Sequence, residues 1–490
     1  MHESSDSETE HAWLRAYGHV IKTPGILGVP FCITSDTRAM TYVLSHTNEY
    51  QKAEDSRKEL GIIVGAGVLV AEGEQHKRQR RVLNPAFGPA QIRALTEIFL
   101  HKALELKNAW AKEIQKTGQT TRIDALSWMN RATLDIIGLA GFGYNFDSVG
   151  GTVNELERAF NTIFDSQTIN LFAIIQGLFP PLKLIRTKRM KSAEEAQAAM
   201  RRIGLKLIEE RKTEILAEMG KSGIQDDSIK TGVRGRDLLT LLIKANMTVD
   251  NTNGQRLSDE EVLGQIPTFM VAGHETTSGA TVWCLFALTQ APEIQRKLRE
   301  ELLAVNTDTP SMDELDALPY LDMVTKESLR FHSPVTMTHR EAQKDDFIPL
   351  DKPYTDRRGR VHDSIQMTKG DIVLIPISIL NRSTEIWGDD AAEFKPERWQ
   401  NPPEAARSIP GVWADMLTFL GGPRSCIGYR FAIIEMKALL FTLVRAFDFD
   451  LAVRAEDVTK RSAITQRPMV LSEKEKGNQL PLLVSLHETV

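Results

Sequence analysis

One cysteine near the end of the chain stands in surroundings that suit chemistry. Cys426 lies among glycines, just before an apolar pattern over 428–446 that predicts a helix. Glycines permit tight turns in which backbone N–H groups point at the sulfur, and the positive end of the following helix favours thiolate over thiol. A thiolate stabilised in this way is a metal ligand or a nucleophile. Cys32 and Cys284 lack such surroundings, so we expect them to be buried structural thiols.

The elements that must position this cysteine are predicted to be mostly helices. Residues 86–220 carry the charged and apolar repeats that are typical of long helices. By contrast, 19–36 and 345–376 have the β-branched, glycine and proline pattern of short strands and turns. The polar, glycine-rich segment 220–236 indicates a flexible loop between helices. We therefore expect a mainly α fold with small β-sheets (α+β).

One long helix is predicted in the middle of the chain. Ser258 and Glu261 form a capping box, in which the N-cap hydroxyl and the N3 carboxylate satisfy each other's backbone N–H groups. The helical pattern continues to about Gln290, where Ala291-Pro292 ends it and starts another helix. Pro267 and Gly273 lie inside the pattern, so we expect a kink or a loosened turn there.

Composition and charge exclude several classes of protein. The chain has 490 residues, of which 42% are hydrophobic and 26% charged, as in an ordered globular protein. Its net charge of −5 gives no general basic surface for nucleic acid. No apolar run reaches the roughly 18 residues of a membrane-spanning helix. We expect the acidic start, 1–10, to be disordered and 11–490 to form a single catalytic domain, with no transmembrane anchor in this chain.

The cysteine loop resembles a known cofactor site. Phe419, Gly422, Arg424, Cys426 and Gly428 fit the pattern F-x-x-G-x-R-x-C-x-G, which resembles the haem-binding loop of the cytochrome P450 family. The resemblance implies haem b, with Cys426 as axial ligand of the iron, Arg424 paired with a propionate and Phe419 shielding the sulfur. It extends over nearly the whole chain and implies that family's single domain, with a long central helix over the haem. The motifs look like those of eukaryotic, microsomal and fungal members.

An E-x-x-R pair and a later arginine fit the same family. Alone, Glu327 and Arg330 would indicate only a solvated surface ion pair. Together with the segment Phe394–Trp399, they resemble the network of one glutamate and two arginines that holds the core behind the haem. Arg398 is the third member, and the role is structural. Loss of any member is expected to leave a buried charge unpaired.

An acid and a threonine in the long helix resemble the family's proton-delivery pair. They lie in the A-G-x-E-T-T segment 272–277, where Gly273 leaves space for oxygen. The resemblance implies that Glu275 relays protons and that the hydroxyl of Thr276 interrupts the helix and holds water. His274 is expected to be a pocket or packing residue. The alternative interpretation is that these are ordinary polar residues of a helix without a catalytic role.

The propionates of the haem are expected to have further partners. The family shows W-x-x-x-R where this chain has His76 and Arg80, so a histidine that can still donate a hydrogen bond replaces the tryptophan. Arg340 resembles another propionate-binding arginine. Three cations of the 76–81 segment form either a solvated helix face or a docking patch for an acidic electron donor: Lys77, Arg78 and Arg81.

The resemblance implies a haem-thiolate monooxygenase that inserts one oxygen atom of O2 into an apolar small molecule, within secondary metabolism. The chain shows no flavin or nicotinamide motif, so we expect a separate NADPH-dependent flavoprotein reductase. Two other functions remain, a peroxide-using or rearranging haem-thiolate enzyme and a non-catalytic haem-binding sensor. Glu275-Thr276 favours the monooxygenase, because peroxide and rearrangement chemistry needs no proton relay. Four residues are expected to line the substrate pocket: Ala272, Val335, Thr336 and Met337.

The resemblance also bears on location. It implies the cytosolic surface of the endoplasmic reticulum, or the cytoplasm if the chain is complete. The apolar segment 171–181, followed by Arg186, Lys188 and Arg189, is either a peripheral membrane contact or the apolar roof of the pocket.

Overall fold

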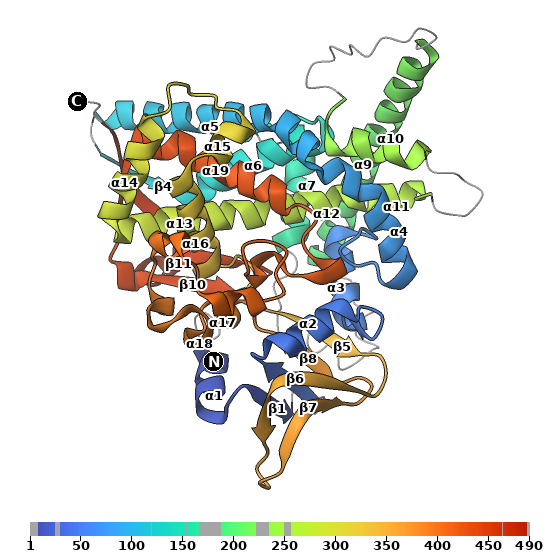
Figure 1. Cartoon of the computed structure of the whole chain (residues 1–490). Helices are drawn as coiled ribbons and strands as arrows, with labels where there is room; N and C mark the ends of the chain where they lie inside the picture. The colour runs from blue at the N-terminus through green and yellow to red at the C-terminus, as the bar shows by residue number, and fades with distance from the viewer. Residues whose placement is uncertain are drawn as a thin grey trace. The chain divides into compact units, whose positions relative to one another are not determined.

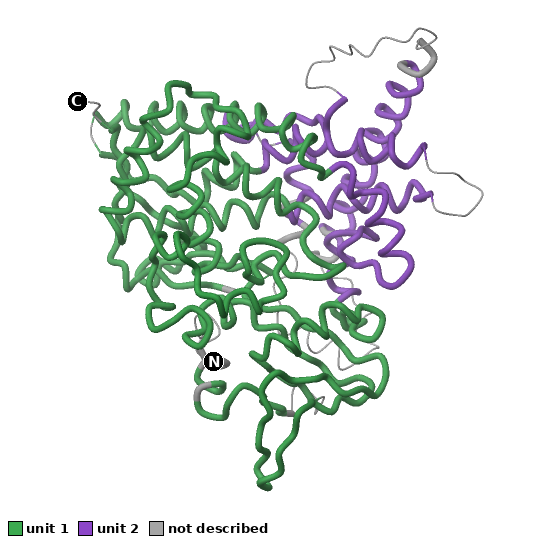
Figure 2. The backbone as a smooth tube through the Cα atoms, viewed as in Figure 1, with its two compact units in different colours: residues 1–56, 87–133, 273–490 green, residues 57–86, 134–272 purple. Residues whose placement is uncertain are grey.

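The computed structural model (Figure 1) describes residues 8–24, 30–118, 120–152, 154–165, 188–221, 235–248, 256–462 and 464–487. Helices predominate and the strands form small sheets, which confirms the predicted mainly α fold. Figure 2 shows two compact units: unit 1 comprises 1–56, 87–133 and 273–490, and unit 2 comprises 57–86 and 134–272. Most predicted site residues belong to unit 1, whereas His76, Arg80 and Ala272 belong to unit 2.

Unit 1 holds most of the helices around the cysteine loop. Its helices are α1 (Glu8–Tyr17), α2 (Thr37–Ser45), α5 (Pro89–Thr117), α13 (Thr276–Gln290), α14 (Pro292–Leu303), α15 (Met312–Asp316), α16 (Pro319–Phe331), α17 (Ile377–Asn381), α18 (Thr384–Trp387) and α19 (Tyr429–Ala446). Short 3-10 turns follow α18 and flank the cysteine loop: η6 (Asp389–Ala392), η7 (Pro396–Gln400), η8 (Glu404–Ser408), η9 (Leu417–Phe419) and η10 (Gly422–Arg424). Two more, η11 (Ala455–Asp457) and η12 (Leu471–Lys476), lie near the end of the chain.

The described strands of unit 1 form four small sheets. The largest has the order β1-β2-β8-β5-β3, in which β2 and β8 are parallel and the other pairs antiparallel. Its strands are β1 (Val20–Pro24), β2 (Pro30–Thr34), β3 (Tyr50–Gln51), β5 (Thr338–Ala342) and β8 (Ile372–Ile375). The others are the hairpins β6 (Asp346–Thr355)–β7 (Val361–Met367) and β10 (Val458–Ser462)–β11 (Gln466–Val470), and the sheet of β4 (Thr121–Asp124), β12 (Pro481–Leu486) and β9 (Phe447–Leu451). Strands in both 19–36 and 345–376 are thereby confirmed.

Unit 2 is helical. It contains α4 (Gly73–Leu83), α7 (Glu155–Asp165), α9 (Lys188–Lys221), α10 (Leu238–Thr248), α11 (Asp259–Leu263) and α12 (Gln265–Met270). Four of the described elements contain residues of both units: α3 (Glu54–Val64), η2 (Asn84–Phe87), α6 (Ala125–Phe142) and the π-helix η5 (Val271–Glu275). Most of the predicted loop 220–236 lies outside the described residues, as does the apolar segment 171–181 with Arg186.

The start of the long central helix follows the sequence only in part. The capping box is confirmed, because the Glu261 N–H donates to the Ser258 hydroxyl (3.2 Å) and the Ser258 N–H donates to the Glu261 carboxylate (3.0 Å). The helical pattern predicted to about residue 290 is interrupted after α11, which ends at Leu263, and α12 begins at Gln265, close to the kink expected at Pro267. Pro267 causes the break: it has no N–H for the carbonyl four residues earlier, and its ring disturbs that turn.

The second interruption lies at the predicted active segment. A π-helix, η5 (Val271–Glu275), separates α12 from α13. Gly273 lies inside it, which agrees with the loosened turn expected there. A π-turn widens the helix and leaves backbone groups out of the regular ladder, and such turns are frequent at functional sites. The residues expected to handle protons therefore stand at the junction of η5 and α13.

Two helices form the core behind these residues. α13 is buried along most of its length, and α19 is buried almost continuously from Phe431 to Val444. A helix that is apolar on all sides belongs in the middle of a protein. α19 packs against α5, α13, α14 and α16, and Figure 1 shows it running beside α5. The helix that follows the cysteine loop is therefore held on several sides.

Candidate active site

The cysteine loop presents its sulfur outward. Cys426 follows η10 and precedes α19, and its side chain is exposed, whereas Phe419 beside it is only 9% exposed. The Cys426 N–H donates to the Phe419 carbonyl (2.8 Å), which closes the loop. Leu420 adopts a positive φ of 53°, a strained conformation for a residue with a side chain. The fold thus accepts strain to keep this turn tight.

Close backbone packing explains two glycines of the loop. A Cβ on Gly422 would overlap the Leu44 carbonyl oxygen, and its φ of 68° also favours glycine. A Cβ on Gly421 would overlap the Pro410 carbonyl oxygen. Gly421 was not among the predicted site residues, although the glycine pair in the sequence was a signal for it. A Cβ on Gly428 would make only ordinary contact, so sterics do not demand that glycine.

A polar anchor that the sequence did not indicate holds the loop to α16 and α17. The Asn381 side chain accepts from the Leu417 N–H (2.9 Å) and donates to the Thr418 hydroxyl (2.9 Å) and the Ser333 hydroxyl (3.0 Å). The Thr418 hydroxyl in turn donates to the Leu329 carbonyl (2.7 Å). Isolated Asn and Thr residues carry no motif, so no local signal could have identified this anchor.

The other two cysteines differ from Cys426 as expected. Cys32 and Cys284 are buried, and burial raises the pKa of each thiol to about 12. They therefore remain neutral thiols at physiological pH. No disulfide joins any of the three cysteines. Of the three cysteines, Cys426 alone is exposed, and its role as a ligand stays a prediction.

Glu275 is buried in a set of contacts that the sequence did not reveal. Its side chain is 5% exposed, and its Oε1 accepts from the Thr465 hydroxyl (2.8 Å) and from the Nε and Nη2 groups of Arg467. Its Oε2 is also buried but has no hydrogen-bond partner among the described residues. Arg467 and Thr465 belong to β11 and the turn before it, about 190 residues away in sequence. That separation hid them from sequence reasoning.

One face of this helix remains accessible. Gly273 and Thr276 are half-buried, whereas the neighbouring Glu275, Thr277 and His274 are buried. Burial, with a smaller effect of the Arg467 charge, lowers the pKa of His274 to about 4. A neutral imidazole at this depth fits the expected packing role. The accessible face is the one on which Thr276 lies.

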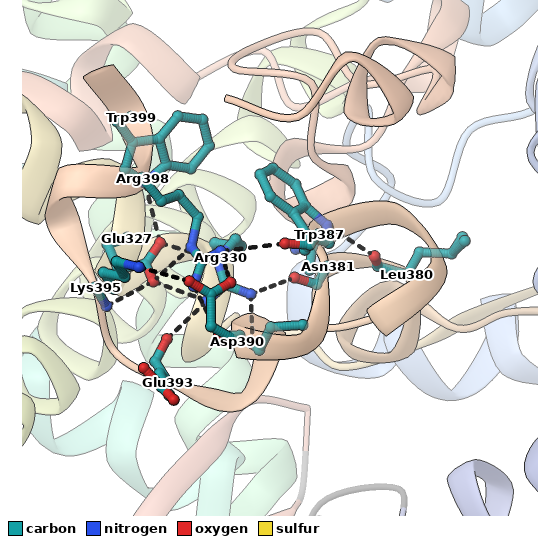
Figure 3. Close-up of polar contacts among 11 residues, drawn as sticks. Glu327, Arg330, Leu380, Asn381, Trp387, Asp390, Glu393, Lys395, Arg398 and Trp399 are labelled. Atoms are coloured by element: carbon teal, nitrogen blue, oxygen red, sulfur yellow. Dashed lines mark hydrogen bonds and ion pairs between the residues drawn. The ribbon is translucent and has the colours of Figure 1, made fainter. Parts of the chain in front are cut away.

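Figure 3 shows the residues of the predicted glutamate–arginine network together. Glu327 and Arg330 on α16 are fully buried and joined by two hydrogen bonds of 2.8 and 2.9 Å. Arg330 also donates to the carbonyls of Asn381, Ala391 and Glu393. All five of its N–H groups therefore have acceptors.

The second arginine joins from η7. Arg398 donates to Glu327 (3.2 Å) and to the side chain (2.6 Å) and backbone carbonyl (2.7 Å) of Asp390. Glu327 also accepts from the indole N–H of Trp399 (3.0 Å) and the backbone N–H of Lys395 (2.9 Å). Hydrogen bonds from Lys395 and Arg398 lower the pKa of Asp390 to about 2. Asp390 therefore also belongs to this network, although it was not predicted from the sequence.

The predicted propionate partners lie in separate parts of the chain. In unit 1, Arg340 is buried on β5 and donates to the Thr338 hydroxyl (3.2 Å) and the His339 carbonyl (2.7 Å), while Arg424 is half-buried on η10. In unit 2, His76 and Arg80 lie four residues apart on α4 and so share a helix face.

The cations next to them on α4 have acidic partners. Lys77 pairs with Glu74 (2.7 Å), and Arg78 pairs with Glu261. Both pairs join residues of unit 2. Part of the positive charge proposed for a docking patch is therefore already engaged.

The predicted pocket residues of unit 1 lie together in the segment that connects α16 to β5. Val335, Thr336 and Met337 are half-buried between α16 and β5. The Thr336 carbonyl accepts from Ser378 N–H (2.9 Å), and the carbonyl of the preceding Pro334 accepts from the N–H of Gln466 in β11 (2.8 Å). The structure thus links this connection to the strand that carries Arg467. Ala272, in η5, is exposed.

The chemistry of the site fits a haem. No group of three His, Cys, Asp or Glu side chains that could hold a metal ion occurs within the described part of the chain. A single exposed thiol, Cys426, on a rigid loop suits an iron whose other ligands come from the cofactor itself. Phe419, whose carbonyl accepts from the Cys426 N–H, adds an apolar and nearly buried side chain to the same loop.

Comparison with known proteins covers almost the whole chain. The cytochrome P450 family model matches residues 14–478. Cytochrome P450 monooxygenase 205 of Postia placenta is 53% identical over 99% of the chain and 90% of its own length. Cytochrome P450 monooxygenase claO of Ampulloclitocybe clavipes is 36% identical (98% and 89%), and ganoderic acid synthetase CYP5150L8 of Ganoderma lucidum is 34% identical (90% and 84%).

Proposed function

The chain belongs to the cytochrome P450 family of monooxygenases, and on this premise we propose that it is a haem b enzyme that transfers one oxygen atom of O2 to an apolar small molecule. The observation that carries the proposal is the exposed Cys426 sulfur on a loop fixed by Asn381 and by close glycine packing. When bound, the haem supplies the activation of O2. The residues of the chain hold it and manage protons and water.

Each residue near the cofactor has a proposed task. Cys426 is the axial ligand, and Phe419 excludes water from its sulfur. Arg424 and Arg340 hold the propionates by charge-assisted hydrogen bonds. His76 and Arg80, on one face of α4, are proposed to do the same.

Protons are proposed to pass through Glu275 and Thr276. Arg467 and Thr465 fix one carboxylate oxygen of Glu275, and the other oxygen, Oε2, is available to take up a proton. Arg467 is 24% exposed, so this buried acid connects to solvent through its partner. Thr276, next along the helix, lies on the accessible face and orients water there.

The substrate is proposed to be an apolar product of secondary metabolism. The name ganoderic acid synthetase, borne by one relative, supports such a role. Val335, Thr336 and Met337, with Ala272, are proposed to contact the substrate. A peroxide-using enzyme is the less favoured alternative, because the buried Glu275 and its partners have no purpose in such chemistry.

Electrons are proposed to come from a separate NADPH-dependent flavoprotein reductase at the cytosolic face of the endoplasmic reticulum. Among the described helices, none is long and apolar enough to cross a membrane. Lys188 and Arg189 begin α9, while the apolar residues proposed as a peripheral membrane contact lie outside the described residues.

The spectrum of the reduced protein with carbon monoxide tests the proposal. We expect a strongly red-shifted Soret band that is lost in Cys426→Ser and kept in Cys284→Ala, a control at a buried thiol. Consumption of NADPH with added reductase then separates the monooxygenase from the peroxide enzyme and from a sensor. A band unaffected by Cys426→Ser contradicts the thiolate ligand, and turnover with peroxide but none with NADPH and reductase contradicts the need for a reductase.

A further inference from the structure

A cavity that the proposed function does not use lies near the last turns of α19, at the end of this helix away from the cysteine loop. It is lined by residues of α5, of α14 with the segment that follows it, and of α19, all in unit 1, and its volume is about 170 Å³. α19 packs on both α5 and α14 (Figure 1). Thr442 in the cavity wall comes about 20 Å along the helix from Tyr429, where α19 begins. The cavity is therefore separate from the loop that carries Cys426.

Half of the cavity wall is apolar. It consists of Leu104 of α5, Leu303 of α14, and Phe441 and Ala446 of α19. Leu303 and the polar residue Asp308 are exposed, so the cavity opens to solvent beside them. Ligand sites typically combine such apolar walls with a few polar groups, and those for drug-sized molecules have volumes of about 300–1,000 Å³. The smaller volume here suits a compact molecule.

Two cations and one acid line much of the remaining wall. Arg445 is fixed, because it donates to the carbonyls of Val305 (3.2 Å) and Thr307 (2.6 Å) and pairs with Asp308 (3.2 Å). Lys107 of α5 is half-buried, and its side chain has no ion pair or hydrogen bond among the described residues. Since Asp308 balances Arg445, Lys107 gives the cavity one positive charge without a counter-charge.

The last polar group of the wall is the hydroxyl of Thr442. This residue is 4% exposed, and its Oγ1 has no hydrogen-bond partner within the described part of the chain. Helical threonines can donate to the carbonyl four residues earlier, as Thr281 does on α13 (2.9 Å), and a buried hydroxyl without an acceptor is unfavourable. Threonine adopts two rotamers in a helix, so rotation of the side chain exchanges its methyl and hydroxyl groups. An acceptor in the cavity would give this hydroxyl the partner that the chain does not supply.

We propose that this cavity is a binding site for a small organic acid with a compact apolar body. Its carboxylate accepts hydrogen bonds from Nζ of Lys107 and from the hydroxyl of Thr442. Its apolar body lies against Leu104 and Phe441. A carboxylate supplies the missing counter-charge, and hydrogen bonds to a charged group are stronger than neutral ones. An inorganic anion would leave the apolar wall in water, and a neutral molecule would leave Lys107 without a counter-charge.

Isothermal titration calorimetry of the purified protein with its haem, using phenylacetate as the probe, tests this site. We expect saturable binding that weakens at least about tenfold in Lys107→Met, because a charge-assisted hydrogen bond is lost. Lys112→Met, at an exposed lysine of the same helix, is the control and should keep the wild-type affinity. 2-Phenylethanol, which has the same ring without the charge, should bind much more weakly. Equal affinity in Lys107→Met, equal binding of 2-phenylethanol or no binding of phenylacetate overturns the proposal.

A second variant and the haem spectrum distinguish this cavity from the substrate pocket. Thr442→Val keeps the shape of the side chain and removes the hydroxyl, so phenylacetate should bind about threefold more weakly or worse. The Soret band should not move, because the cavity lies away from Cys426. Binding that shifts the Soret band and persists in Lys107→Met would place the acid in the substrate pocket and overturn the proposal. Inorganic phosphate that binds as tightly as phenylacetate would overturn the assignment to an organic acid.

Discussion

Glu327 and Glu275 are both buried and both paired with arginine, but they differ in how many hydrogen bonds each carboxylate oxygen accepts. Glu327 receives five hydrogen bonds on its two oxygens, from Arg330, Arg398, Trp399 and the backbone of Lys395. Glu275 receives all of its bonds on Oε1, and its buried Oε2 has none among the described residues.

We interpret this difference as one between an acid that holds the fold together and an acid that is proposed to move protons. A fully satisfied buried charge network fixes the fold, because removing any member leaves the others without partners. A buried oxygen without a partner costs stability, and its retention is explained if it has to accept a proton. The two sites should therefore respond to substitution in opposite ways, one by loss of folding and the other by loss of activity.

The largest effect is expected at the structural site. Arg330→Met leaves the Glu327 carboxylate buried without its main partner, which should lower the free energy of unfolding by about 3–5 kcal/mol or prevent folding. Denaturant unfolding and haem content measure this. Arg454→Met, at an exposed arginine paired with Asp457, is the control and should change nothing measurable. A stable Arg330→Met protein would mean that the network is not essential to the fold.

The stability of the protein should fall at acidic pH because of His274, which lies next to Glu275 in the sequence. Because His274 has a pKa of about 4 in the folded protein and near 6.5 when unfolded, the unfolded state binds more protons between these values. Stability is therefore complete above about pH 6.5 and falls by roughly 3 kcal/mol as pH drops to about 4. His274→Asn should make the free energy of unfolding less dependent on pH between 6.5 and 4, whereas His101→Asn, at an exposed histidine, should keep that dependence. An equally steep fall of stability with pH in His274→Asn would show that His274 is not its cause.

At the working site, the expected loss is in turnover. Glu275→Gln keeps the shape of the side chain but cannot relay protons, so product formation should fall about 100-fold while haem binding is kept. Turnover with reductase and the carbon monoxide spectrum measure the two separately. If Glu275→Gln instead failed to fold as Arg330→Met does, the distinction between the two acids would be lost.

The smallest effect is expected at the edge of the structural network. Asp390 binds Arg398 and Lys395 at a partly exposed position, so Asp390→Asn should cost below about 1 kcal/mol at pH 7. Its pKa is about 2 in the folded protein against about 3.9 unfolded, so its contribution is present above pH 4 and disappears as pH falls towards 2. Unfolding at pH 7 and near pH 2 tests this. A difference that persists at low pH would show that the carboxylate charge is not the cause.

The sequence determined the features that depend on neighbours along the chain. The mainly α fold, the strands in 19–36 and 345–376, the capping box at Ser258 and the loosened turn at Gly273 all follow from local pattern and backbone chemistry. The family followed as well, because the cysteine loop keeps its residue types at fixed spacing. The interruption between α11 and α12 likewise lies close to Pro267, where a kink was expected.

Only the tertiary structure decided which polar groups meet. Arg467 and Thr465 reach Glu275, and Asn381 fixes the cysteine loop. Each partner lies tens to hundreds of residues from the group that it contacts, and none belongs to a motif. Burial, which sets the pKa of His274, likewise arises only when distant helices close around it. Local sequence therefore sets elements and residue types, whereas distant contacts decide which buried acid is paired or available to a proton.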